Sequence, residues 1–508
     1  MKRLHDLCKF DDFTIMGNSK CRINGIAYHS QYVKQGYIFV AIDGFSSSGR
    51  NYIDEAITNG ASAVACEDKN LIKQLAKKYP HVSFIYTTDC RRFLAVAANW
   101  FYGFPANDIK LIGITGTDGK TTTSYLIKSI LDAAGKPTGL IGTIKYFDGD
   151  KYLPATHTTP ESLDLVKFLY TLKTKKIKYC VCEVSSHALA LNRVYGLNFR
   201  VVVFTNISQD HLDFHGTLSA YKKAKLKLFQ MVDSNAYSIV NLNDRFSETI
   251  IRNTKATIVG YGINIPKVPD SVKLIVTGEI ISKTVRGTKV EVKIITRPFN
   301  KISKLDVFLP MIGEHNVFNM LAAIATGYVL KIPDKNIISG ISICPPVLGR
   351  LQKVSEKHGI SIYIDYAHTP KGLETAIKSL RDITKGRIIV VFGCGGNRDF
   401  QKRPIMGKIS TELADFVIVT SDNPRNEDPL KIISDIAKGI EKENYKIIVD
   451  RADAINEAIR MAQKNDTILI AGKGHENYQI IGFQKIPYSD FSAVKKSLKY
   501  LNIKTKMK

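Results

Sequence analysis

The 508-residue sequence lacks paired-cysteine motifs and long apolar segments. Its eight cysteines include no Cys-x-x-Cys pair, which disfavours a zinc knuckle and indicates a reduced chain. No apolar run approaches the ~20 residues that a membrane-spanning helix needs. The basic residues after Met1 are not followed by the apolar core of a secretory signal. We therefore expect a cytoplasmic protein with no membrane span.

Acidic residues are scarce relative to basic ones. The chain has 72 Lys and Arg against 47 Asp and Glu, so its formal net charge is +25. The lysines are spread over every segment, and the sequence has no basic arm and no basic stripe with interleaved aromatic residues. We therefore expect no nucleic-acid partner. We interpret the charge as a general property that would attract anionic small substrates.

The length predicts about three domains of roughly 150 residues each. We place an N-terminal α/β domain at residues 1–106, because a break at Gly103 and Pro105 follows a predicted helix. Alternating apolar strands and helical segments predict a central parallel sheet in residues 107–345 and a second doubly wound sheet in residues 346–508. The expected fold class is therefore α/β, with three domains.

A glycine-rich segment between a predicted strand and a predicted helix has the pattern of a phosphate-binding loop. It contains Gly116 and Gly119, followed directly by Lys120 and Thr121. The glycines permit a close backbone path, the lysine supplies a cation, and the threonine supplies a hydroxyl for a metal ion. Ile114 stands where the standard motif has its first glycine, so a glycine-rich turn that binds nothing is the alternative.

Polar residues also mark the ends of two further strands in the central domain. Glu183 lies near the end of the apolar run 179–184, and the run 201–205 leads into a His/Asp cluster that includes His211. Ligands of open parallel sheets bind at the carboxyl ends of strands, so we expect both groups beside the phosphate loop. They are candidate Mg²⁺ ligands, and a capped polar turn is the alternative for the cluster. Residues 255–310 alternate and predict an antiparallel patch.

The C-terminal domain repeats this arrangement. Four apolar strands lead into polar motifs, and a plain loop would not need the charged groups that these motifs carry. The four motifs occupy residues 365–370, 393–399, 420–425 and 471–476. We therefore expect a ligand site along one edge of this sheet.

Six motifs together resemble the Mur ligases of peptidoglycan synthesis, in the order of that family and over nearly the whole chain. They are residues 116–121, 183–187, 210–216, 313–319, 365–370 and 471–476. A seventh segment, Asp-Asn-Pro-Arg at residues 422–425, is typical of the diaminopimelate-adding members of the family.

The resemblance implies an N-terminal UDP-binding domain, a central ATPase domain and a C-terminal amino-acid-binding domain. It implies that ATP phosphorylates the D-glutamate carboxylate of UDP-N-acetylmuramoyl-L-alanyl-D-glutamate. The amine of meso-diaminopimelate would then attack the acyl phosphate, giving the UDP-muramoyl tripeptide, ADP and phosphate. We expect the ligase to act as a monomer on these small molecules, with Mg²⁺ as cofactor.

The resemblance also assigns catalytic and metal-binding groups. These are Lys120, Thr121, Glu183, His211 and Lys225. Lys225 would carry a carbamate derived from CO₂, which replaces a cation with the oxygen ligands that Mg²⁺ prefers. Lys223 and Lys227 lie close by in the sequence, and spacing alone does not choose among the three lysines.

Contacts to three substrates follow from the same resemblance. ATP would contact Gly116, Thr117, Asp118, Gly119, Lys120, Thr121, Thr122, Asn316, Asn319, Arg350 and Asp365. The UDP substrate would contact Ser30, Phe45, Ser46, Ser47, Thr158, Thr159, Ser185, Leu191 and Arg193. Diaminopimelate would contact Arg398, Asp422, Asn423, Pro424, Arg425, Gly472 and Glu476. An arginine can bind the second carboxylate of diaminopimelate through two parallel hydrogen bonds, whereas lysine would leave Arg425 without that partner.

The chain departs from the usual family pattern at several positions. They are His29, Gln31, Asp118, His157, Leu191 and Asn397. Asp118 places a carboxylate near the expected phosphates, and His29 and Gln31 change contacts expected for pyrophosphate or uridine. The main catalytic groups are all present.

Other functions compete with this interpretation. Within the family, a ligase that adds lysine or another amino acid is disfavoured by Arg425. A folylpolyglutamate synthase would share the ATP-binding fold but should lack the Asp-Asn-Pro-Arg segment. A nucleic-acid-binding P-loop ATPase should show a Walker B strand and a coherent basic face. A nucleotide-binding pseudoenzyme is disfavoured by the complete catalytic set.

Overall fold

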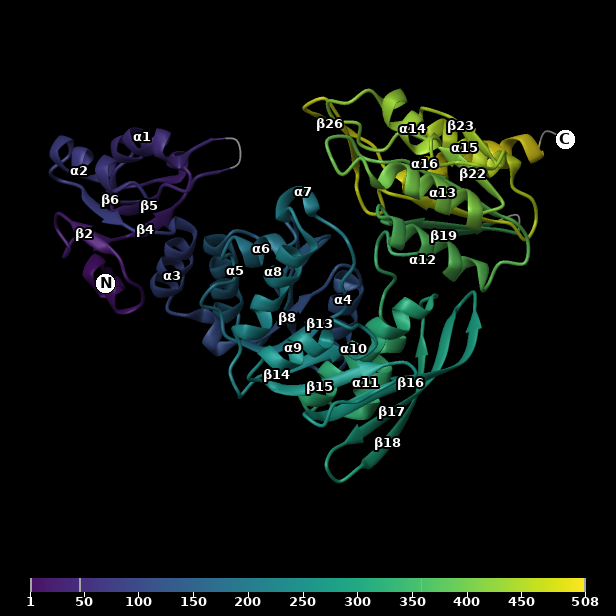
Figure 1. The fold of residues 1–508 in the computed structure, drawn as a ribbon, viewed down its shortest axis with the longest axis horizontal. Helices are drawn as coiled ribbons and strands as arrows, with labels where there is room; N and C mark the ends of the chain where they lie inside the picture. Colours follow the sequence, from purple (N-terminus) through teal and green to yellow (C-terminus); the bar gives the residue numbers. More distant parts are fainter. Residues whose placement is uncertain (1, 45–46, 358, 507–508) are drawn as a thin grey trace.

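The computed structural model describes residues 2–44, 47–357 and 359–506. Three α/β units follow one another in a row, with the two chain termini on opposite units (Figure 1). Each unit has its own principal sheet, of five, eleven and six strands respectively. This arrangement confirms the expected three-domain α/β fold.

The N-terminal unit is a five-stranded sheet in the order β2-β7-β6-β5-β4, in which only the edge strand β2 is antiparallel. Alternation along β5 sends Ile38 and Val40 to one face and Phe39 to the other, as the period of a strand requires. Its elements are β2 (Thr14–Met16), β4 (Gly25–Ala27), β5 (Tyr37–Val40), β6 (Ala61–Cys66), β7 (Ser83–Tyr86), α1 (Ile53–Thr58), α2 (Lys69–Lys78) and α3 (Cys90–Tyr102), with a short pair β1 (Lys2–Arg3) and β3 (Arg22–Ile23) beside them.

The central sheet has the order β11-β10-β9-β12-β8-β13-β14-β15-β16-β17-β18. It is parallel from β9 to β16. The antiparallel patch expected within residues 255–310 is present as the meander β16-β17-β18. The strands are β8 (Lys110–Thr115), β9 (Thr138–Ile141), β10 (Lys145–Phe147), β11 (Tyr152–Pro154), β12 (Tyr179–Glu183), β13 (Phe199–Phe204), β14 (Tyr237–Asn241), β15 (Thr257–Gly262), β16 (Val272–Thr284), β17 (Gly287–Thr296) and β18 (Lys301–Leu309).

Helices cover both faces of the central sheet. Leu111 of β8 packs into the core that holds α5 and α8, whereas Ile112 packs into the core that holds α4, α10 and α11. The first of these cores continues into the N-terminal unit through α3, so it joins the two units. The helices are α4 (Lys120–Ala133), α5 (Ser162–Thr174), α6 (Ser186–Ala190), α7 (Leu212–His215), α8 (Leu218–Gln230), α9 (Ser247–Asn253), α10 (Glu314–Val329) and α11 (Asp334–Ser342).

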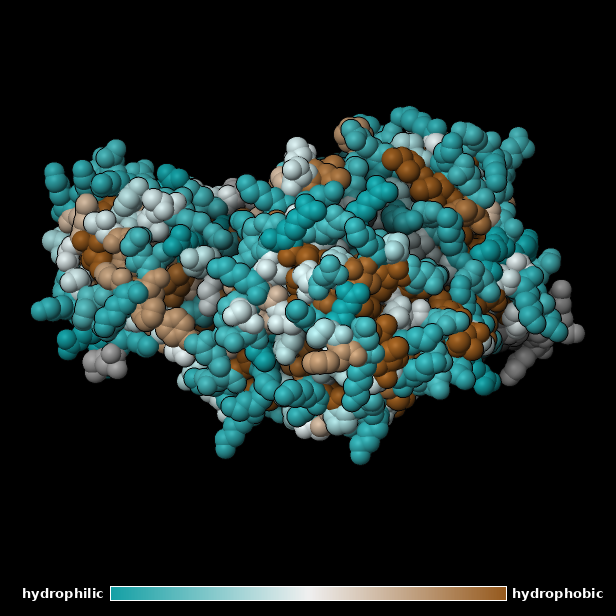
Figure 2. Space-filling model, turned by 60° about the horizontal axis from the view of Figure 1, so that its bottom comes forward, coloured by the Kyte–Doolittle hydropathy of each residue, from teal (hydrophilic) through white to brown (hydrophobic). Residues whose placement is uncertain are grey.

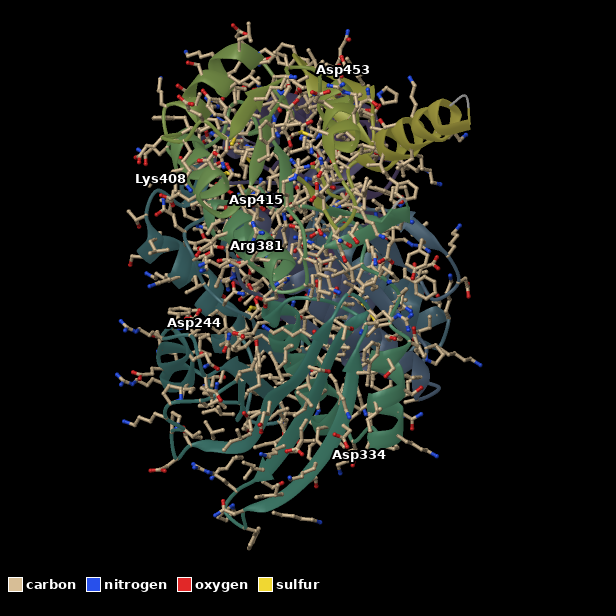
Figure 3. All side chains as sticks on the ribbon, turned by 90° about the vertical axis from the view of Figure 1, so that its right-hand side faces the viewer. Asp244, Asp334, Arg381, Lys408, Asp415 and Asp453 are labelled. Atoms are coloured by element: carbon tan, nitrogen blue, oxygen red, sulfur yellow. The ribbon has the colours of Figure 1, made fainter. Side chains whose placement is uncertain are left out.

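The C-terminal unit is a six-stranded sheet in the order β19-β20-β24-β21-β22-β23, antiparallel only at β19. The end of α12 and the start of β22 meet at an ion pair, in which Arg381 lies 2.7 Å from Asp415 (Figure 3). Its elements are β19 (Gln352–Lys357), β20 (Ile360–Asp365), β21 (Ile388–Phe392), β22 (Phe416–Val419), β23 (Tyr445–Ile447), β24 (Thr467–Ala471), β25 (Tyr478–Ile481), β26 (Gln484–Pro487), α12 (Pro370–Arg381), α13 (Lys402–Leu413), α14 (Pro429–Ala437), α15 (Arg451–Met461) and α16 (Asp490–Lys506).

The face shown in Figure 2 is mostly hydrophilic, with apolar side chains in separate groups among polar ones. Within the described ranges, no helix is both long and apolar enough to cross a membrane.

Candidate functional site

The phosphate loop connects β8 to α4 in a conformation that its glycines permit. Gly116 has a φ of +151° and Gly119 a φ of +84°, both in a region that side chains disfavour. A Cβ on Gly116 would come within 1.8 Å of the Thr205 hydroxyl, and one on Gly119 within 2.3 Å of the Asn319 amide oxygen. Lys120 follows, and its ammonium donates to the carbonyls of Gly116 and Thr117 at 2.8 Å each. The loop therefore has the backbone shape and the cation of a phosphate cradle.

A second lysine lies under this loop. Lys225 of α8 is buried, and its Nζ donates to the Gly116 carbonyl at 2.7 Å. Burial, and next the charge of Lys120, lower the pKa of Lys225 well below its ordinary value. Burial likewise lowers the pKa of Lys120. Lys225 thus lies in an environment that favours its neutral amine, which is the nucleophilic form.

Glu183 ends β12 directly beside the start of α4. Its Oε2 accepts hydrogen bonds from the hydroxyls of Thr121 at 2.9 Å and Thr143 at 3.0 Å, and its Oε1 accepts from the Thr143 backbone amide at 3.1 Å. Glu183 is fully buried. A buried carboxylate beside a threonine hydroxyl at a phosphate loop is a donor set that suits Mg²⁺.

His211 lies at the N-terminus of α7, with a left-handed backbone (φ +53°). Its ring lies beside that of His187, with centroids 4.8 Å apart, and its Nε2 is 3.4 Å from the Asp210 carboxylate. Burial lowers the pKa of His211 to about 4, so the imidazole is neutral at physiological pH and has a lone pair for a ligand.

A cavity of about 370 Å³ opens between the phosphate loop and the C-terminal unit. It unites predicted ATP contacts from distant parts of the chain, namely Asp118, Gly119, Thr121, Thr122, Asn316, Asn319, Arg350 and Asp365. Arg350 reaches across to the central unit, with its Nη2 3.5 Å from the Thr121 hydroxyl. The remaining predicted contacts, Gly116, Thr117 and Lys120, belong to the same loop.

Asp365 is held at the floor of this cavity by two backbone amides. Its carboxylate accepts from Leu351 at 2.6 Å and from Ala367 at 2.8 Å. Burial raises the pKa of Asp365 to about 6, although Arg350 acts in the opposite direction.

A second cavity, of about 510 Å³, lies between His211 and the loops of the C-terminal sheet. It is lined by predicted diaminopimelate contacts, which are Arg398, Asp422, Asn423, Arg425, Gly472 and Glu476. Pro424 is the member of the predicted set that does not line it. The two cavities adjoin, because Ser208, Tyr366, His368, Thr369 and Lys371 line both.

Two arginines, together with Lys371 and Lys402, supply the positive charge of the second cavity. Arg425 has a left-handed backbone (φ +52°), and its Nη1 donates to the Gly396 carbonyl at 2.7 Å. Burial, and then the nearby charge of Arg398, lower the pKa of Arg425 below its ordinary value. Two neighbouring guanidinium groups that repel one another form a site that an anion would stabilise.

The predicted contacts to the UDP substrate fall in two places. In the central unit, the Thr159 hydroxyl donates to the Glu183 carbonyl at 2.8 Å, and Arg193 donates to the Thr159 carbonyl at 3.0 Å. In the N-terminal unit, the buried Ser30 donates to Glu55 at 2.9 Å. Those contacts that the structure describes, which also include Ser47, Thr158, Ser185 and Leu191, line neither cavity. Phe45 and Ser46 lie outside the described residues.

Comparison with known families matches three Mur ligase regions to the chain. The Mur ligase family catalytic domain matches residues 22–102, the Mur ligase middle domain residues 114–327, and the Mur ligase glutamate ligase domain residues 349–474. Relatives that match over nearly the full length of the chain support the same family. A UDP-N-acetylmuramoyl-L-alanyl-D-glutamate–2,6-diaminopimelate ligase of Caldanaerobacter subterraneus is 42% identical over 98% of this chain and 99% of its own. The chain belongs to the Mur ligase family.

Further relatives and solved structures are consistent with this membership. The enzyme of the same name from Clostridioides difficile is 41% identical over 96% of this chain and 98% of its own. A solved structure of a ligase with that name has a TM-score of 0.67 at 26% identity and covers 99% of both chains. The MurF ligase of Thermotoga maritima, solved with ADP, shares the fold at 18% identity, with a TM-score of 0.60 and coverage of 94% of this chain and 97% of its own.

Several residues of this Mur ligase site were assigned no role by the sequence analysis. Thr143 holds Glu183 in place through a hydrogen bond. Asp244, which is labelled in Figure 3, lines the cavity of about 370 Å³ from the central unit. Lys473 is fully buried beneath Asn423 and Glu476. The motif at residues 471–476 contains Lys473, but neither composition nor spacing shows that its side chain turns inward.

The residues predicted to bind a metal ion do not form a conventional cluster. In the part of the chain that the structure describes, no group of three or more His, Cys, Asp and Glu side chains is placed to hold a metal ion. The donors that are present are a hydroxyl, single carboxylates and a neutral imidazole. Such a set fits a cation that takes most of its ligands from phosphate oxygens and water, as Mg²⁺ does.

Proposed function

We propose that this Mur ligase adds meso-diaminopimelate to UDP-N-acetylmuramoyl-L-alanyl-D-glutamate at the expense of ATP. The products are the UDP-muramoyl tripeptide, ADP and phosphate, in peptidoglycan precursor synthesis. The observation that carries the proposal is the pair of adjoining cavities, one lined by the phosphate loop and the other by paired arginines and acids. An activated carboxyl group formed at the first cavity would face an amine held in the second.

In the first step, a D-glutamate carboxylate oxygen attacks the γ-phosphorus of ATP, and the bond from that phosphorus to ADP breaks. Lys120 and the backbone amides of the loop stabilise the negative charge that spreads over the transferred group. Arg350 and the Asn316–Asn319 pair, whose amides lie 3.1 Å apart, line the nucleotide cavity and orient ATP. Positioning and charge stabilisation are the main contributions that a protein makes to such a transfer.

In the second step, the neutral amine of the amino acid attacks the carbonyl carbon of the acyl phosphate. The tetrahedral intermediate collapses to the amide, phosphate leaves, and the amine loses its proton. Arg398 and Arg425 bind the distal carboxylate of diaminopimelate, and Glu476 and Asp422 accept from its distal ammonium. L-Lysine has no distal carboxylate, so it would leave the arginine pair without an anion.

Thr121 and Glu183 would hold one Mg²⁺, and His211 with Lys225 would hold a second. The metal would neutralise charge on the phosphate oxygens of ATP and of the acyl phosphate. Lys225 would first react with CO₂, forming an N–C bond and releasing one proton, so that a carbamate replaces the amine. Its buried environment and lowered pKa support this proposal, because only the neutral amine attacks CO₂.

The UDP substrate would extend from the central unit toward the N-terminal one. Thr158, Thr159, Ser185, Leu191 and Arg193 would contact its peptide end. The N-terminal residues Ser30, Phe45, Ser46 and Ser47 would contact the nucleotide end. We also propose domain limits of 1–106, 107–345 and 346–508, and a monomer that acts in the cytoplasm.

A single assay tests the function. The purified protein is mixed with ATP, Mg²⁺ and the UDP-muramoyl dipeptide, and phosphate release is followed with meso-diaminopimelate or with L-lysine. We expect release that depends on meso-diaminopimelate. No release with either amino acid would refute the ligase assignment, and faster release with lysine would refute the proposed role of Arg425.

A further inference from the structure

The loop that follows β24 directs a lysine side chain into the protein interior. Gly472 has a φ of +116°, and Lys473 directly after it is fully buried. The Lys473 ammonium lies 2.9 Å from the amide oxygen of Asn423 and 3.0 Å from Oε2 of Glu476. It also lies 3.9 Å from the Asp422 carboxylate. One buried cation therefore contacts the side chains of three residues that line the second cavity, and it does not itself line that cavity.

These contacts fix the orientation of the Asn423 side chain. Its Oδ1 accepts from Lys473 and also from the backbone amide of Ile480 at 3.0 Å. The Nδ2 group must then point the other way, and it donates to Glu476 Oε2 at 2.9 Å. Glu476 is thus held by two donors, Lys473 and Asn423, on the same oxygen.

The charges around Lys473 are matched to an amino acid. Asp422 and Glu476 present two carboxyl groups to the single ammonium of Lys473, so this side of the cavity is rich in acceptor oxygens. Arg398 and Arg425 carry two positive charges on the other lining loops. A molecule with one ammonium and one carboxylate at the same carbon would satisfy both sides.

We propose that Lys473 is a positioning residue for the amino-acid substrate. It orders Asn423 and, with it, Glu476, so that the Glu476 carboxylate accepts from the distal ammonium while the two arginines bind the adjacent carboxylate. The inference rests on the proposed function, because it concerns the amine-binding half of that reaction. A buried ammonium is costly unless it is paired, so Lys473 and Glu476 depend on each other.

Lys473→Met tests this role, because it removes the charge and keeps most of the side-chain volume. We expect the KM for meso-diaminopimelate to rise at least about tenfold, as expected for the loss of a charge-assisted hydrogen-bond network. The KM values for ATP and the UDP substrate should stay within about twofold. Lys485→Met is the matched control, because Lys485 is exposed on β26 and its loss changes the net charge equally. An unchanged KM for the amino acid would overturn the inference.

A double-mutant cycle separates positioning from a general structural role. If Lys473 acts through Glu476, the losses in kcat/KM caused by Lys473→Met and Glu476→Gln should combine to much less than their product. Fully multiplicative losses would overturn the inference. Lys473→Gln keeps a polar group in the site and replaces the methionine variant if that variant does not fold, with the same expected and contradicting results.

The same assay distinguishes failure of the proposed function from failure of the role proposed for Lys473. The wild-type enzyme is measured first with ATP, the UDP substrate and meso-diaminopimelate. Absence of wild-type turnover refutes the proposed function. Wild-type turnover together with an unchanged amino-acid KM in the Lys473 variants refutes the inference alone.

Discussion

Two buried lysines, Lys225 and Lys473, lie on opposite sides of the site and have different surroundings. Lys225 donates to a backbone carbonyl, and the described residues place no carboxylate within ion-pair distance of it. Burial lowers the pKa of Lys225, and the positive charge of Lys120 lowers it further. Lys473 instead contacts Glu476 at 3.0 Å and the amide oxygen of Asn423 at 2.9 Å.

The difference shows how one residue type can serve two purposes. Burial without an anionic partner favours the neutral amine, which is nucleophilic and open to modification. Burial with a carboxylate and an amide fixes the geometry of those partners. We therefore expect chemical reactivity at Lys225 and a purely electrostatic role at Lys473.

Among the variants that test this comparison, Lys225→Met should have the largest effect. We expect kcat to fall at least about 1,000-fold, because the loss removes the oxygen ligands that the carbamate would supply to a metal at the phosphoryl group. Incubation with ¹³C-labelled CO₂ should give a carbamate signal by NMR that this variant lacks. Lys223→Met, at an exposed position on the same helix, is the control and should behave as wild type. Activity within tenfold of wild type in Lys225→Met would contradict the account.

Arg425→Ala should have the next largest effect. Loss of a desolvated arginine–carboxylate pair should raise the KM for meso-diaminopimelate about 100- to 1,000-fold. ATP affinity, measured by calorimetry, should remain unchanged, because the arginine lines only the second cavity. Arg381→Ala is the control, because Arg381 forms a half-exposed ion pair with Asp415 away from both cavities. A parallel loss of ATP affinity in Arg425→Ala would show that the two cavities are not functionally separate.

Asp365 predicts a pH dependence of stability. Burial raises the pKa of Asp365 from 3.8 to about 6, so the folded protein binds this proton more tightly than the unfolded chain does. This contribution, of up to about 3 kcal/mol, is present below pH ~4 and is lost as pH rises through the folded-state pKa. The Tm of wild type relative to Asp365→Asn should therefore fall between pH 4 and 6. A Tm difference that stays constant across this range would contradict the assignment.

Thr143→Val should have the smallest effect. It removes one hydroxyl donor to Glu183 and leaves the backbone donor at 3.1 Å in place. We expect about a tenfold higher Mg²⁺ concentration for half-maximal turnover, since a hydrogen bond to a charged group is worth ~1.5–3 kcal/mol. Thr143→Ser keeps the hydroxyl and should resemble wild type. An unchanged Mg²⁺ dependence in the valine variant would show that Glu183 is held without Thr143.

Much of the fold could be predicted from the sequence, because parallel strands that are buried on both faces consist of continuous apolar residues. The runs at residues 179–184 and 201–205 correspond to β12 and β13, and the phosphate loop lies between β8 and α4 as expected. The motifs at strand ends line two cavities because the carboxyl ends of parallel strands meet at one edge. The short strands β10 and β11 had no such signal and were not predicted.

The supporting contacts could not be predicted in the same way. Glu476 was expected to face the substrate, but its Oε2 is already bound by Lys473 and Asn423. Thr143 holds Glu183 across 40 positions in the sequence, and Gly142 beside it has no room for a Cβ, which would lie 2.2 Å from Glu183 Oε1. Such pairings depend on tertiary packing, which a single sequence does not encode as a local pattern.

The central claim is that a carboxyl group is activated at the phosphate loop and then passed to an amine in the adjoining cavity. The most direct test uses a UDP-muramoyl dipeptide whose D-glutamate side-chain carboxylate carries ¹⁸O in both oxygens. The released phosphate is analysed by mass spectrometry after reaction with ATP, Mg²⁺ and meso-diaminopimelate. The account predicts one ¹⁸O atom in each phosphate released, because the carboxylate oxygen that attacks phosphorus leaves with it. Phosphate free of ¹⁸O, formed together with the tripeptide, would contradict it.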